Sequence, residues 1–389
     1  MKEGMGMQKT LNIAMIGCGF MGKMHSNAYS KVNSIFDLDY TACMKVACDS
    51  RDNGKVVKDF ASRWHWQEME TDWRRLLDRK DIDLIDICVP NSLHREIAVA
   101  SLAAGKMVCT EKPLALNAEQ GAQMVEAAEK SGKKTMIWFN QRRFPSVTLA
   151  KQMIDDGALG RVFHYRGTYL QDWTISKEAP FGGPTFWRLD LKDAGSGVTG
   201  DLLAHALDVA MWLNGPIVDL SAMTETFIKE RKTQADSSKV VKVEIDDAAQ
   251  CMVRFANGSI GTFEASRYAR GRKNANAFEI NGEFGSFAFD AETPDQLKFY
   301  NHKDDSKIRG WKVISVWDSD QPYMDRWWVP GMGISYEHTF VHAAADFLAD
   351  LADGKKRVPD FSDGLRTQMV CDTILASAKK GQWMKTGLT

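Results

Sequence analysis

The chain has 389 residues, of which 44% are hydrophobic and 26% are charged, and its formal net charge is −1. This composition is typical of a soluble protein of about two domains, and the near-neutral charge argues against a nucleic-acid or membrane partner. The N-terminal stretch MKEGMGMQKT lacks the apolar core of a secretory signal, and no apolar run approaches the ~18 residues that span a bilayer. The seven cysteines are dispersed, which predicts reduced thiols, a cytoplasmic protein and no metal site.

Apolar strands alternate with helical patterns over residues 1–140. We expect strands at 11–17, 45–49, 84–90, 106–110 and 134–139, and helices at 53–64, 72–80, 93–105 and 118–132. Two of these helices end at a glycine that is followed by lysine and a new strand, as C-caps do. The alternation predicts a parallel sheet covered on both faces, which binds ligands at the carboxyl ends of its strands.

Residues 141–389 carry a different pattern and predict a second domain. Longer strands are expected at 160–173, 248–267 and 276–290, and the turn signals ANGS and NGEFGS divide the last two into hairpins. Helices are expected at 200–215, 339–354 and 364–381, and the polar segment 228–243 predicts a solvated loop. The predicted fold class is therefore α/β, with an N-terminal dinucleotide-binding domain (1–140) and a mainly antiparallel C-terminal domain (141–389).

The loop after the first strand reads GCGFMG, and Phe20 and Met21 separate its last two glycines. In this motif Gly17 makes the tight turn, Gly19 lets a pyrophosphate approach the backbone, and Gly22 lets helix and strand pack closely. The phosphates would lie at the N-terminus of the following helix. The motif predicts a dinucleotide site, with a purely structural glycine turn as the alternative.

Asp49, at the end of the second strand, is the expected partner of the adenosine ribose. Asp37 and Asp39 lie nearer the usual spacing from the glycine loop, but neither ends an apolar strand. A carboxylate at this position accepts both ribose hydroxyls and repels a 2′-phosphate, which favours NAD over NADP. Arg51 lies two residues later and could accept that phosphate, so NADP stays open.

The fourth strand ends at Thr110 and is followed by Glu111-Lys112-Pro113. These residues lie at the edge of the sheet where a nicotinamide would bind. Pro113 keeps Lys112 extended, and a partly desolvated lysine beside a cationic ring can exchange a proton near neutral pH. The alternative is a surface lysine at the end of a strand.

Asp201 and His205 form a second candidate pair in the segment GDLLAHALD. They are four residues apart, so on a helix they share one face and could converge on one hydroxyl, with the imidazole as acid or base. A structural hydrogen bond is the simpler alternative, and metal binding is not expected because no third ligand has motif spacing. Asp208 either orients the pair or faces solvent.

Four motifs, GCGFMG, VPNSLHREIAVASLAAGK, CTEKPLA and GDLLAHALD, together resemble the glucose–fructose oxidoreductase / inositol dehydrogenase / MocA family. They occur in family order, and the likeness covers nearly the whole chain. FNQRRFP, GTYLQDW, FWR, AGSG and MGISYEHT resemble its levoglucosan dehydrogenase branch, which oxidises the C3 hydroxyl of an anhydrosugar with NAD. The resemblance implies a Rossmann domain, a C-terminal α/β domain with a large open sheet, and a homodimer or homotetramer.

The resemblance also implies roles for single residues. The catalytic residues would be Lys112, Asp201 and His205; the cofactor would be bordered by Pro90, Asn91, His94, Glu111, Trp187 and Arg188; and the sugar would lie near Gln171, Trp173 and Tyr336. Where many relatives read NYRR, this chain has Gln141 in place of the tyrosine. That difference removes a ring and a hydroxyl near the sugar.

The predicted reaction is the reversible oxidation of a secondary ring hydroxyl, at C3, to the ketone. The substrate would be a sugar, an anhydrosugar such as levoglucosan, a glucoside or a cyclitol. Lys112 or His205 would take the hydroxyl proton, with Asp201 orienting the site. Two other functions stay open: an NAD-dependent, redox-neutral glycosidase, and a sensor that binds dinucleotide and sugar without turnover.

Overall fold

The computed structural model describes residues 8–389, which divide into two compact units. The first consists of residues 8–115, Glu119–Arg143 and Tyr336–Leu365, and the second of Leu116–Ala118, Phe144–Ser335 and Arg366–Thr389. The domain boundary at residue 140 stays a prediction; the first unit differs from it by including Tyr336–Leu365. The prediction that the chain has no secretory signal was based on its first ten residues, and residues 1–7 lie outside the described residues. None of the described helices is both long and apolar enough to cross a membrane.

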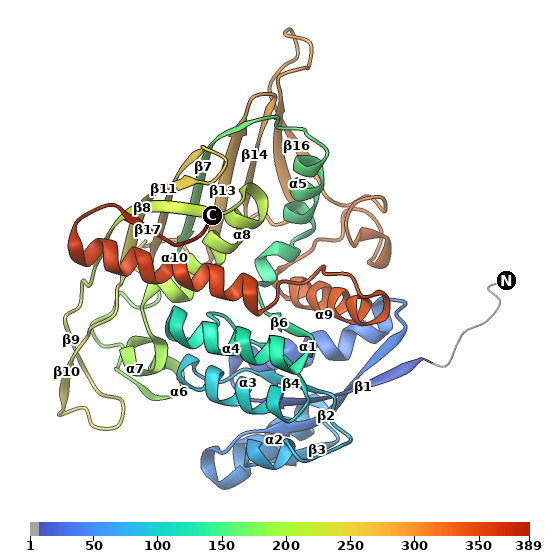
Figure 1. Ribbon diagram of the computed structural model, residues 1–389, viewed down its shortest axis with the longest axis vertical. Helices are drawn as coiled ribbons and strands as arrows, with labels where there is room; N and C mark the ends of the chain where they lie inside the picture. Colours follow the sequence, from blue (N-terminus) through green and yellow to red (C-terminus); the bar gives the residue numbers. More distant parts are fainter. Residues whose placement is uncertain (1–7) are drawn as a thin grey trace, which may run out of the picture. The chain divides into compact units, whose positions relative to one another are not determined.

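The first unit contains a six-stranded parallel sheet in the order β3-β2-β1-β4-β5-β6 (Figure 1). Its strands are β1 (Lys9–Ile16), β2 (Tyr40–Cys48), β3 (Glu68–Glu70), β4 (Leu84–Ile87), β5 (Met107–Thr110) and β6 (Thr135–Ile137). This is the strand order of the doubly wound dinucleotide-binding fold, so the predicted Rossmann domain is confirmed. Strands β4 and β6 are buried at every residue, as expected of strands in a parallel sheet that is covered on both faces.

The helices of the first unit are α1 (Phe20–Ile35), α2 (Lys55–Trp64), α3 (His94–Ala103), α4 (Ala118–Ser131) and α9 (Tyr336–Asp353). Two local predictions were wrong. The helix expected at 72–80 is one 3-10 turn, Trp73–Leu76, capped by the Asp72 carboxylate, which accepts from the Arg74 N–H. Strand β3 was not predicted, because three residues with two glutamates among them carry no apolar pattern.

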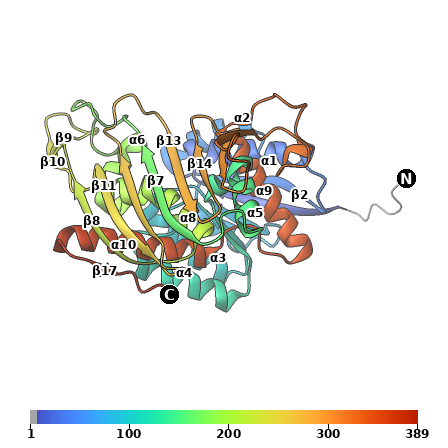
Figure 2. The ribbon, with the colours of Figure 1, turned by 90° about the horizontal axis from the view of Figure 1, so that it is seen from above.

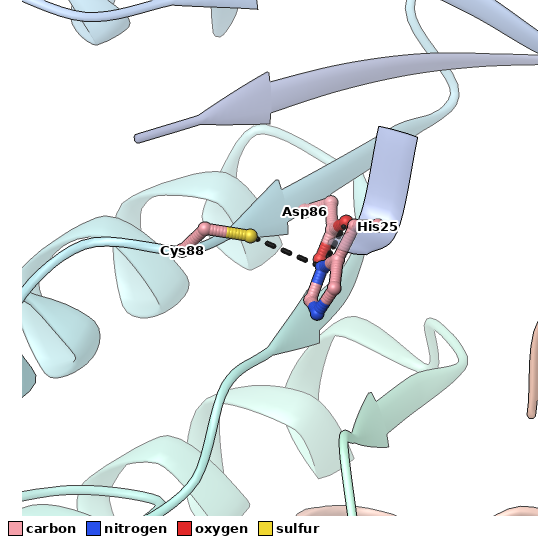
Figure 3. A group of neighbouring side chains, drawn as sticks. All are labelled: His25, Asp86 and Cys88. Atoms are coloured by element: carbon pink, nitrogen blue, oxygen red, sulfur yellow. Dashed lines mark hydrogen bonds and ion pairs between the residues drawn. The ribbon is translucent and has the colours of Figure 1, made fainter. Parts of the chain in front are cut away.

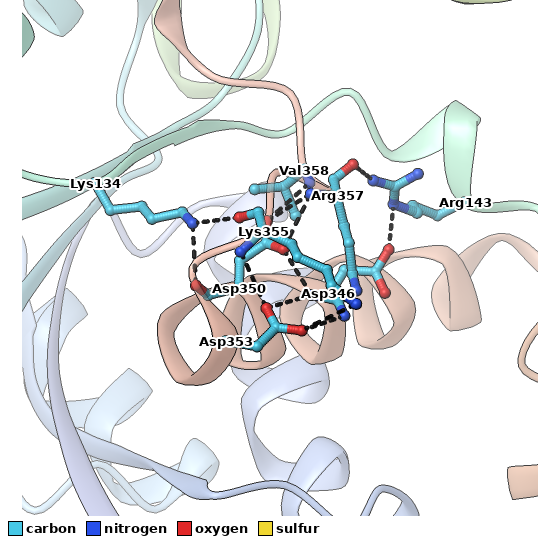
Figure 4. A network of polar contacts seen from close by, with 8 residues as sticks. All are labelled: Lys134, Arg143, Asp346, Asp350, Asp353, Lys355, Arg357 and Val358. Carbon is cyan, nitrogen blue, oxygen red and sulfur yellow. Dashed lines mark hydrogen bonds and ion pairs between the residues drawn. The ribbon is translucent and has the colours of Figure 1, made fainter.

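A polar network anchors α9 in the first unit, far along the chain from the other helices (Figure 4). The buried Asp350 carboxylate accepts hydrogen bonds from the backbone N–H and the guanidinium of Arg357. Lys134, just before β6, donates to the carbonyl of Asp350 at 3.1 Å. Arg143 pairs with Asp346 at 2.9 Å and also donates to the carbonyl of Arg357. The bonds of Lys134 and Arg143 join residues more than 200 positions apart, which sequence patterns do not reveal.

The second unit contains a nine-stranded sheet in the order β16-β15-β14-β13-β7-β12-β11-β8-β17 (Figure 2). Its strands are β7 (Val162–Leu170), β8 (Ile217–Glu225), β11 (Ala248–Phe255), β12 (Ile260–Ser266), β13 (Ala275–Gly282), β14 (Gly285–Asp290), β15 (Gln296–Asn301), β16 (Trp311–Ser315) and β17 (Met384–Lys385). Strands β7 and β12 pair in parallel and the other described pairs are antiparallel. The mainly antiparallel sheet is therefore confirmed.

The remaining helices are α5 (Pro145–Asp155), the short α6 (Gly183–Phe186) and α7 (Leu191–Ala194), α8 (Ala204–Asn214) and α10 (Phe361–Lys380). Helix α8 packs on strands β7 and β13. The helix expected at 200–215 begins differently from the prediction, because a π-helical turn, Thr199–Leu203, precedes α8. Turns of this kind inside helices are frequent at functional sites.

The segment predicted as a solvated loop, 228–243, forms a small hairpin instead. Strands β9 (Glu230–Lys232) and β10 (Val240–Lys242) pair antiparallel. Arg231 is buried and donates to the carbonyls of Thr174, Ser176 and Ala179. The polar composition of the segment concealed this one inward-facing guanidinium, which holds the hairpin to the chain around residues 174–179.

Candidate active site

The glycine loop lies between β1 and α1. A Cβ at Gly17 would stand 2.6 Å from the Cys88 carbonyl oxygen, and one at Gly22 would stand 2.3 Å from the Gly17 carbonyl oxygen. Gly17 also has a φ of 108°, which favours glycine. Beside Gly19, the N-cap of α1, no heavy atom of the described residues other than Gly19 and its chain neighbours lies within 4 Å of the Cβ position. The loop therefore has two positions that packing restricts to glycine and one open approach at a helix N-terminus, which fits a pyrophosphate.

Asp49 directly follows β2, whereas Asp37 and Asp39 precede that strand and lie toward its other end. The buried Asp49 carboxylate accepts from the Cys18 N–H at 2.8 Å and from the Arg51 backbone and guanidinium. Burial opposes the charged form, but these hydrogen bonds outweigh it and lower the pKa of Asp49. Arg51 is half-exposed, so its two guanidinium bonds can be exchanged for ribose hydroxyls.

His94 begins α3 and is fully buried. Its ring nitrogens lie 3.0 Å from the carbonyl oxygens of Pro113 and Val89. Burial lowers the pKa of His94, and the hydrogen bonds to the two carbonyls oppose that shift. The ring joins the loop after β4 to the loop after β5. Pro90 and Asn91 occupy the first of these loops, and Asn91 is also buried.

The loop after β5 holds the predicted reactive pair. The buried Glu111 carboxylate accepts from the Lys112 backbone N–H at 3.1 Å, and its other oxygen lies 3.1 Å from His25 Nε2. Lys112 is half-buried, and the Lys112–Pro113 peptide is cis. Both residues follow the carboxyl end of a parallel strand, where ligands of such sheets bind.

In the second unit Asp201 lies within the π-helical turn, and His205 lies on the first turn of α8. The Asp201 carboxylate accepts from Arg267 Nη2 at 2.8 Å and lies 3.4 Å from Arg188 Nε. Its side chain is 18% exposed, so a ligand can still reach it. His205 is buried, with its ring 5.9 Å from that of Tyr169. Asp208 is buried as well, so it does not face solvent.

Asp246 fixes the start of the π-helical turn and was missed by the sequence analysis. Its carboxylate accepts from Gly197 N–H at 2.6 Å and from the N–H and hydroxyl of Thr199 at 2.8 and 2.7 Å. Burial raises the pKa of Asp246, and these hydrogen bonds oppose the shift. Asp201 follows two residues later, so Asp246 supports the backbone that carries it. The only available signal was an acid before a strand, which is common in turns.

Arg267 was also missed, although it ends a predicted strand. Its side chain is fully buried, and Nε and Nη1 have no hydrogen-bond partner among the described residues. The guanidinium carbon lies 5.2 Å from the centre of the Trp173 ring. Trp173 in turn donates to the Gln171 side chain at 2.8 Å. Arg267 thus brings two predicted substrate residues close to the predicted catalytic Asp201.

The other predicted residues are placed as follows. Arg188 stacks on Trp187, with 4.4 Å from its guanidinium carbon to the ring centre, and its contact with Asp201 joins a predicted cofactor residue to a catalytic one. Phe20 is exposed, and Met21 is half-buried. Tyr336 is half-buried at the start of α9. Gln141 is buried, and neither amide atom has a hydrogen-bond partner among the described residues. All these roles stay predictions.

Comparisons with known proteins place both halves of the chain. Residues 11–139 match the oxidoreductase family with an NAD-binding Rossmann fold, and residues 147–288 match the GFO/IDH/MocA C-terminal domain. A levoglucosan dehydrogenase from Pseudarthrobacter phenanthrenivorans is 37% identical, with 97% of this chain and 98% of the relative covered. A solved levoglucosan dehydrogenase complex with NADH and levoglucosan is 37% identical, covers 97% of this chain and 99% of that one, and has a TM-score of 0.92.

An oxidoreductase domain protein from Kribbella flavida is similar to the same extent. It is 40% identical, with 97% of this chain and 99% of that chain covered and a TM-score of 0.93. These matches confirm the predicted resemblance, the α/β fold and the class of NAD-dependent oxidoreductase.

Proposed function

Because the chain belongs to the Gfo/Idh/MocA oxidoreductase family, we propose that it oxidises a secondary ring hydroxyl of a carbohydrate to the ketone with NAD. Levoglucosan is the first substrate to test, because a relative that matches nearly the full length is a levoglucosan dehydrogenase. The proposed position of oxidation is C3. A simple glucoside and a cyclitol are the next candidates, since they present similar secondary hydroxyls.

The cluster around Asp201 carries this proposal. Its carboxylate is fixed by Arg267 and approached by Arg188, yet it keeps an exposed fraction for a ligand hydroxyl. The indole of Trp173 lies beside the Arg267 guanidinium. The same indole donates a hydrogen bond to the side-chain amide of Gln171. A flat apolar ring next to hydrogen-bonding groups suits a sugar, which has C–H faces and hydroxyl edges.

In the proposed mechanism the chain supplies position and proton transfer. NAD, when bound, accepts the hydride. Asp201 accepts a hydrogen bond from the substrate hydroxyl and so orients it, and Lys112 or His205 removes the hydroxyl proton. Glu111 holds the backbone of Lys112 through the N–H bond at 3.1 Å. A pH profile alone does not assign the base, because two interacting groups titrate as a pair.

Cofactor choice follows from the pairing of Asp49 with Arg51. The carboxylate neutralises the guanidinium that would otherwise attract a 2′-phosphate. In our proposal ribose hydroxyls displace the Arg51 side chain from Asp49, which favours NAD over NADP. The glycine loop, with Gly17, Gly19, Phe20, Met21 and Gly22, would receive the pyrophosphate.

The experiment is to mix the purified protein with NAD at alkaline pH and levoglucosan, glucose, simple glucosides or inositols, and to follow NADH absorbance. A rise with one sugar, absent in Lys112→Ala, supports the dehydrogenase and names its substrate class. A flat trace with NAD shown to bind would overturn the proposal. Release of the leaving group from an aryl glycoside would then identify the redox-neutral glycosidase, and its absence would favour a sensor.

We also propose a homodimer or homotetramer. The strands β7, β12, β11 and β8 are neighbours, and each carries an exposed large apolar residue: Phe163, Ile260, Met252 and Met223. Apolar side chains that cluster on one sheet are typical of an interface. Sedimentation velocity of the wild type and of Met223→Lys/Met252→Lys tests this, since the double variant should shift to smaller species. A monomeric wild type would contradict it. A cytoplasmic location stays a prediction.

A further inference from the structure

His25, on α1, lies between two carboxylates in the interior of the first unit. Its Nδ1 is 2.8 Å from Asp86 Oδ2, and its Nε2 is 3.1 Å from Glu111 Oε1. The His25 and Asp86 side chains are fully buried, and that of Glu111 is 7% exposed. Figure 3 shows the Asp86 carboxylate and the Cys88 thiol pointing at the same edge of the ring. None of these residues except Glu111 belongs to the predicted site.

Several further groups lie around the ring, including Phe340, whose ring centre is 5.5 Å from that of His25. Cys88 Sγ lies 3.1 Å from Nδ1, and the Trp138 ring centre lies 4.1 Å from that of His25. Asp86 accepts further hydrogen bonds from the Tyr29 hydroxyl and the Trp138 indole, both at 3.0 Å. The titratable groups that face this cluster from α1, β4, β5 and the loops after them are Tyr29, Asp86, Cys88, Cys109 and Glu111.

The ring has a carboxylate at each nitrogen, so both nitrogens serve best as donors, which is the imidazolium form. Burial by itself disfavours that charge, but the attraction of Asp86 and its hydrogen bond outweigh burial and raise the pKa of His25 well above its ordinary value. Burial raises the pKa of Cys88 to about 12, so the thiol is neutral. With Asp86 and Glu111 ionised, the three groups carry a net charge of −1.

A metal ion could also bind here in principle. His25, Asp86 and Cys88 offer three ligand atoms within 4.8 Å of one another. Zinc would require the thiolate and a ring nitrogen without its proton. The second carboxylate at Nε2 favours a proton on that nitrogen instead, and Cys88 is held as a thiol. An imidazolium between two carboxylates therefore accounts for the contacts.

We propose that His25 is a positioning residue for the reaction: it clamps the Glu111 carboxylate, which in turn holds the backbone of Lys112. The chain of contacts is continuous, from Asp86 to His25, from His25 to Glu111, and from Glu111 to the Lys112 N–H. The imidazolium also offsets one of the two negative charges on Asp86 and Glu111. This inference rests on the proposed function, because it concerns the lysine proposed as base.

The first test compares His25→Gln with His342→Gln. His342 is the matched control, because it is also fully buried in the first unit and its Nδ1 lies 2.9 Å from the Arg143 carbonyl oxygen. Without the imidazolium, two uncompensated carboxylates favour a proton on Lys112. We expect kcat to fall about tenfold, the rising limb of kcat/KM to move up by about one pH unit, and the Kd of NAD to change less than about threefold. His342→Gln should leave the limb in place.

A readout without turnover keeps the inference separate from the proposed function. Acetic anhydride labels only neutral amines, and mass spectrometry reports the labelling midpoint of each lysine. In His25→Gln the midpoint of Lys112 should move up by about one pH unit, while that of exposed Lys133 stays fixed. If the wild type turns over no sugar but Lys112 still shifts, the proposed function fails and the positioning role stands.

The double variant His25→Gln/Glu111→Gln restores the net charge of −1. We expect its Lys112 midpoint to return to within a few tenths of a pH unit of the wild type, with kcat still reduced because the clamp is lost.

A midpoint that does not move in His25→Gln, with a thermal destabilisation equal to that of His342→Gln, would show a packing role only and overturn the inference. Stoichiometric zinc in the purified wild type, lost in His25→Gln, would overturn it in favour of a metal site.

Discussion

Each unit contains a charged side chain that lies between two groups of the opposite charge, and the signs are reversed between the units. In the first, one cation, His25, lies between two carboxylates and is fully buried. In the second, one anion, Asp201, lies between Arg188 and Arg267, and its side chain is 18% exposed. The side chains of the buried cluster are at most 7% exposed, and in our proposal they act by holding Lys112. The Asp201 cluster is partly exposed, and in our proposal it binds the substrate.

The largest effect is expected at Lys112, the residue that the buried His25 cluster supports in our proposal. Lys112→Ala should lower kcat about a thousandfold, within the range expected for loss of a positioned proton acceptor, with little change in the Kd of NAD. Steady-state kinetics and NAD titration measure both values. Lys133→Ala, at an exposed position in the same unit, is the control. Turnover within tenfold of the wild type would remove Lys112 as base and leave His205.

Changes at the Asp201 cluster should cause a smaller loss of activity, and Asp201 should couple more strongly to Arg267 than to Arg188. Asp201→Asn keeps the shape but not the charge, and kcat/KM should fall about a hundredfold. Double-mutant cycles on the free energy of unfolding should couple Asp201 to Arg267 by about 2 kcal/mol and to Arg188 by less than about 1 kcal/mol. The difference follows from the shorter contact, 2.8 against 3.4 Å, and the complete burial of Arg267. Equal couplings would contradict it.

A third pair of opposite charges, Asp49 and Arg51, controls cofactor choice. Asp49→Asn removes the carboxylate that repels a 2′-phosphate and frees Arg51 to bind one. The ratio of kcat/KM for NADP to that for NAD should rise about tenfold. Asp52→Asn is the control. It removes the same charge at an exposed position directly after Arg51 and should leave the ratio unchanged. An unchanged ratio in Asp49→Asn would mean that neither residue reaches the ribose.

The sequence predicted most of the sheet in the first unit, because parallel strands buried on both faces read as apolar runs between helices. It also predicted a tight turn at Gly17, which has a φ of 108°, and close packing at Gly22, where a Cβ would stand 2.3 Å from the Gly17 carbonyl oxygen. It could not predict the π-helical turn, since Asp201 and His205 have the same spacing in either kind of helix. It also missed His25, Asp246 and Arg267, whose partners lie 47 to 86 residues away along the chain. A single buried charge leaves no periodic signal.

The smallest effect on turnover is expected from a change that affects stability alone. His25 and His342 are both fully buried in the first unit, but their surroundings differ. Burial lowers the pKa of His342 from the ordinary value of 6.5 to about 3, and the hydrogen bond to the Arg143 carbonyl only partly opposes that shift. The unfolded chain then binds one more proton between these values, and stability is lost as the pH falls through this window. His342→Gln should abolish that acid loss, which is at most about 1.4 kcal/mol per pH unit.

His25 should show the opposite sign. Its pKa is raised in the folded chain, so its contribution is fully present below 6.5 and is lost as the pH rises through the folded value. The quantity to plot against pH is the free energy of unfolding of the wild type minus that of the variant. This difference should rise with pH for His342→Gln and fall with pH for His25→Gln. Urea denaturation with matched buffers measures both slopes. Parallel slopes would show that His25 is neutral, and the contrast between a charged and an uncharged buried histidine would then disappear.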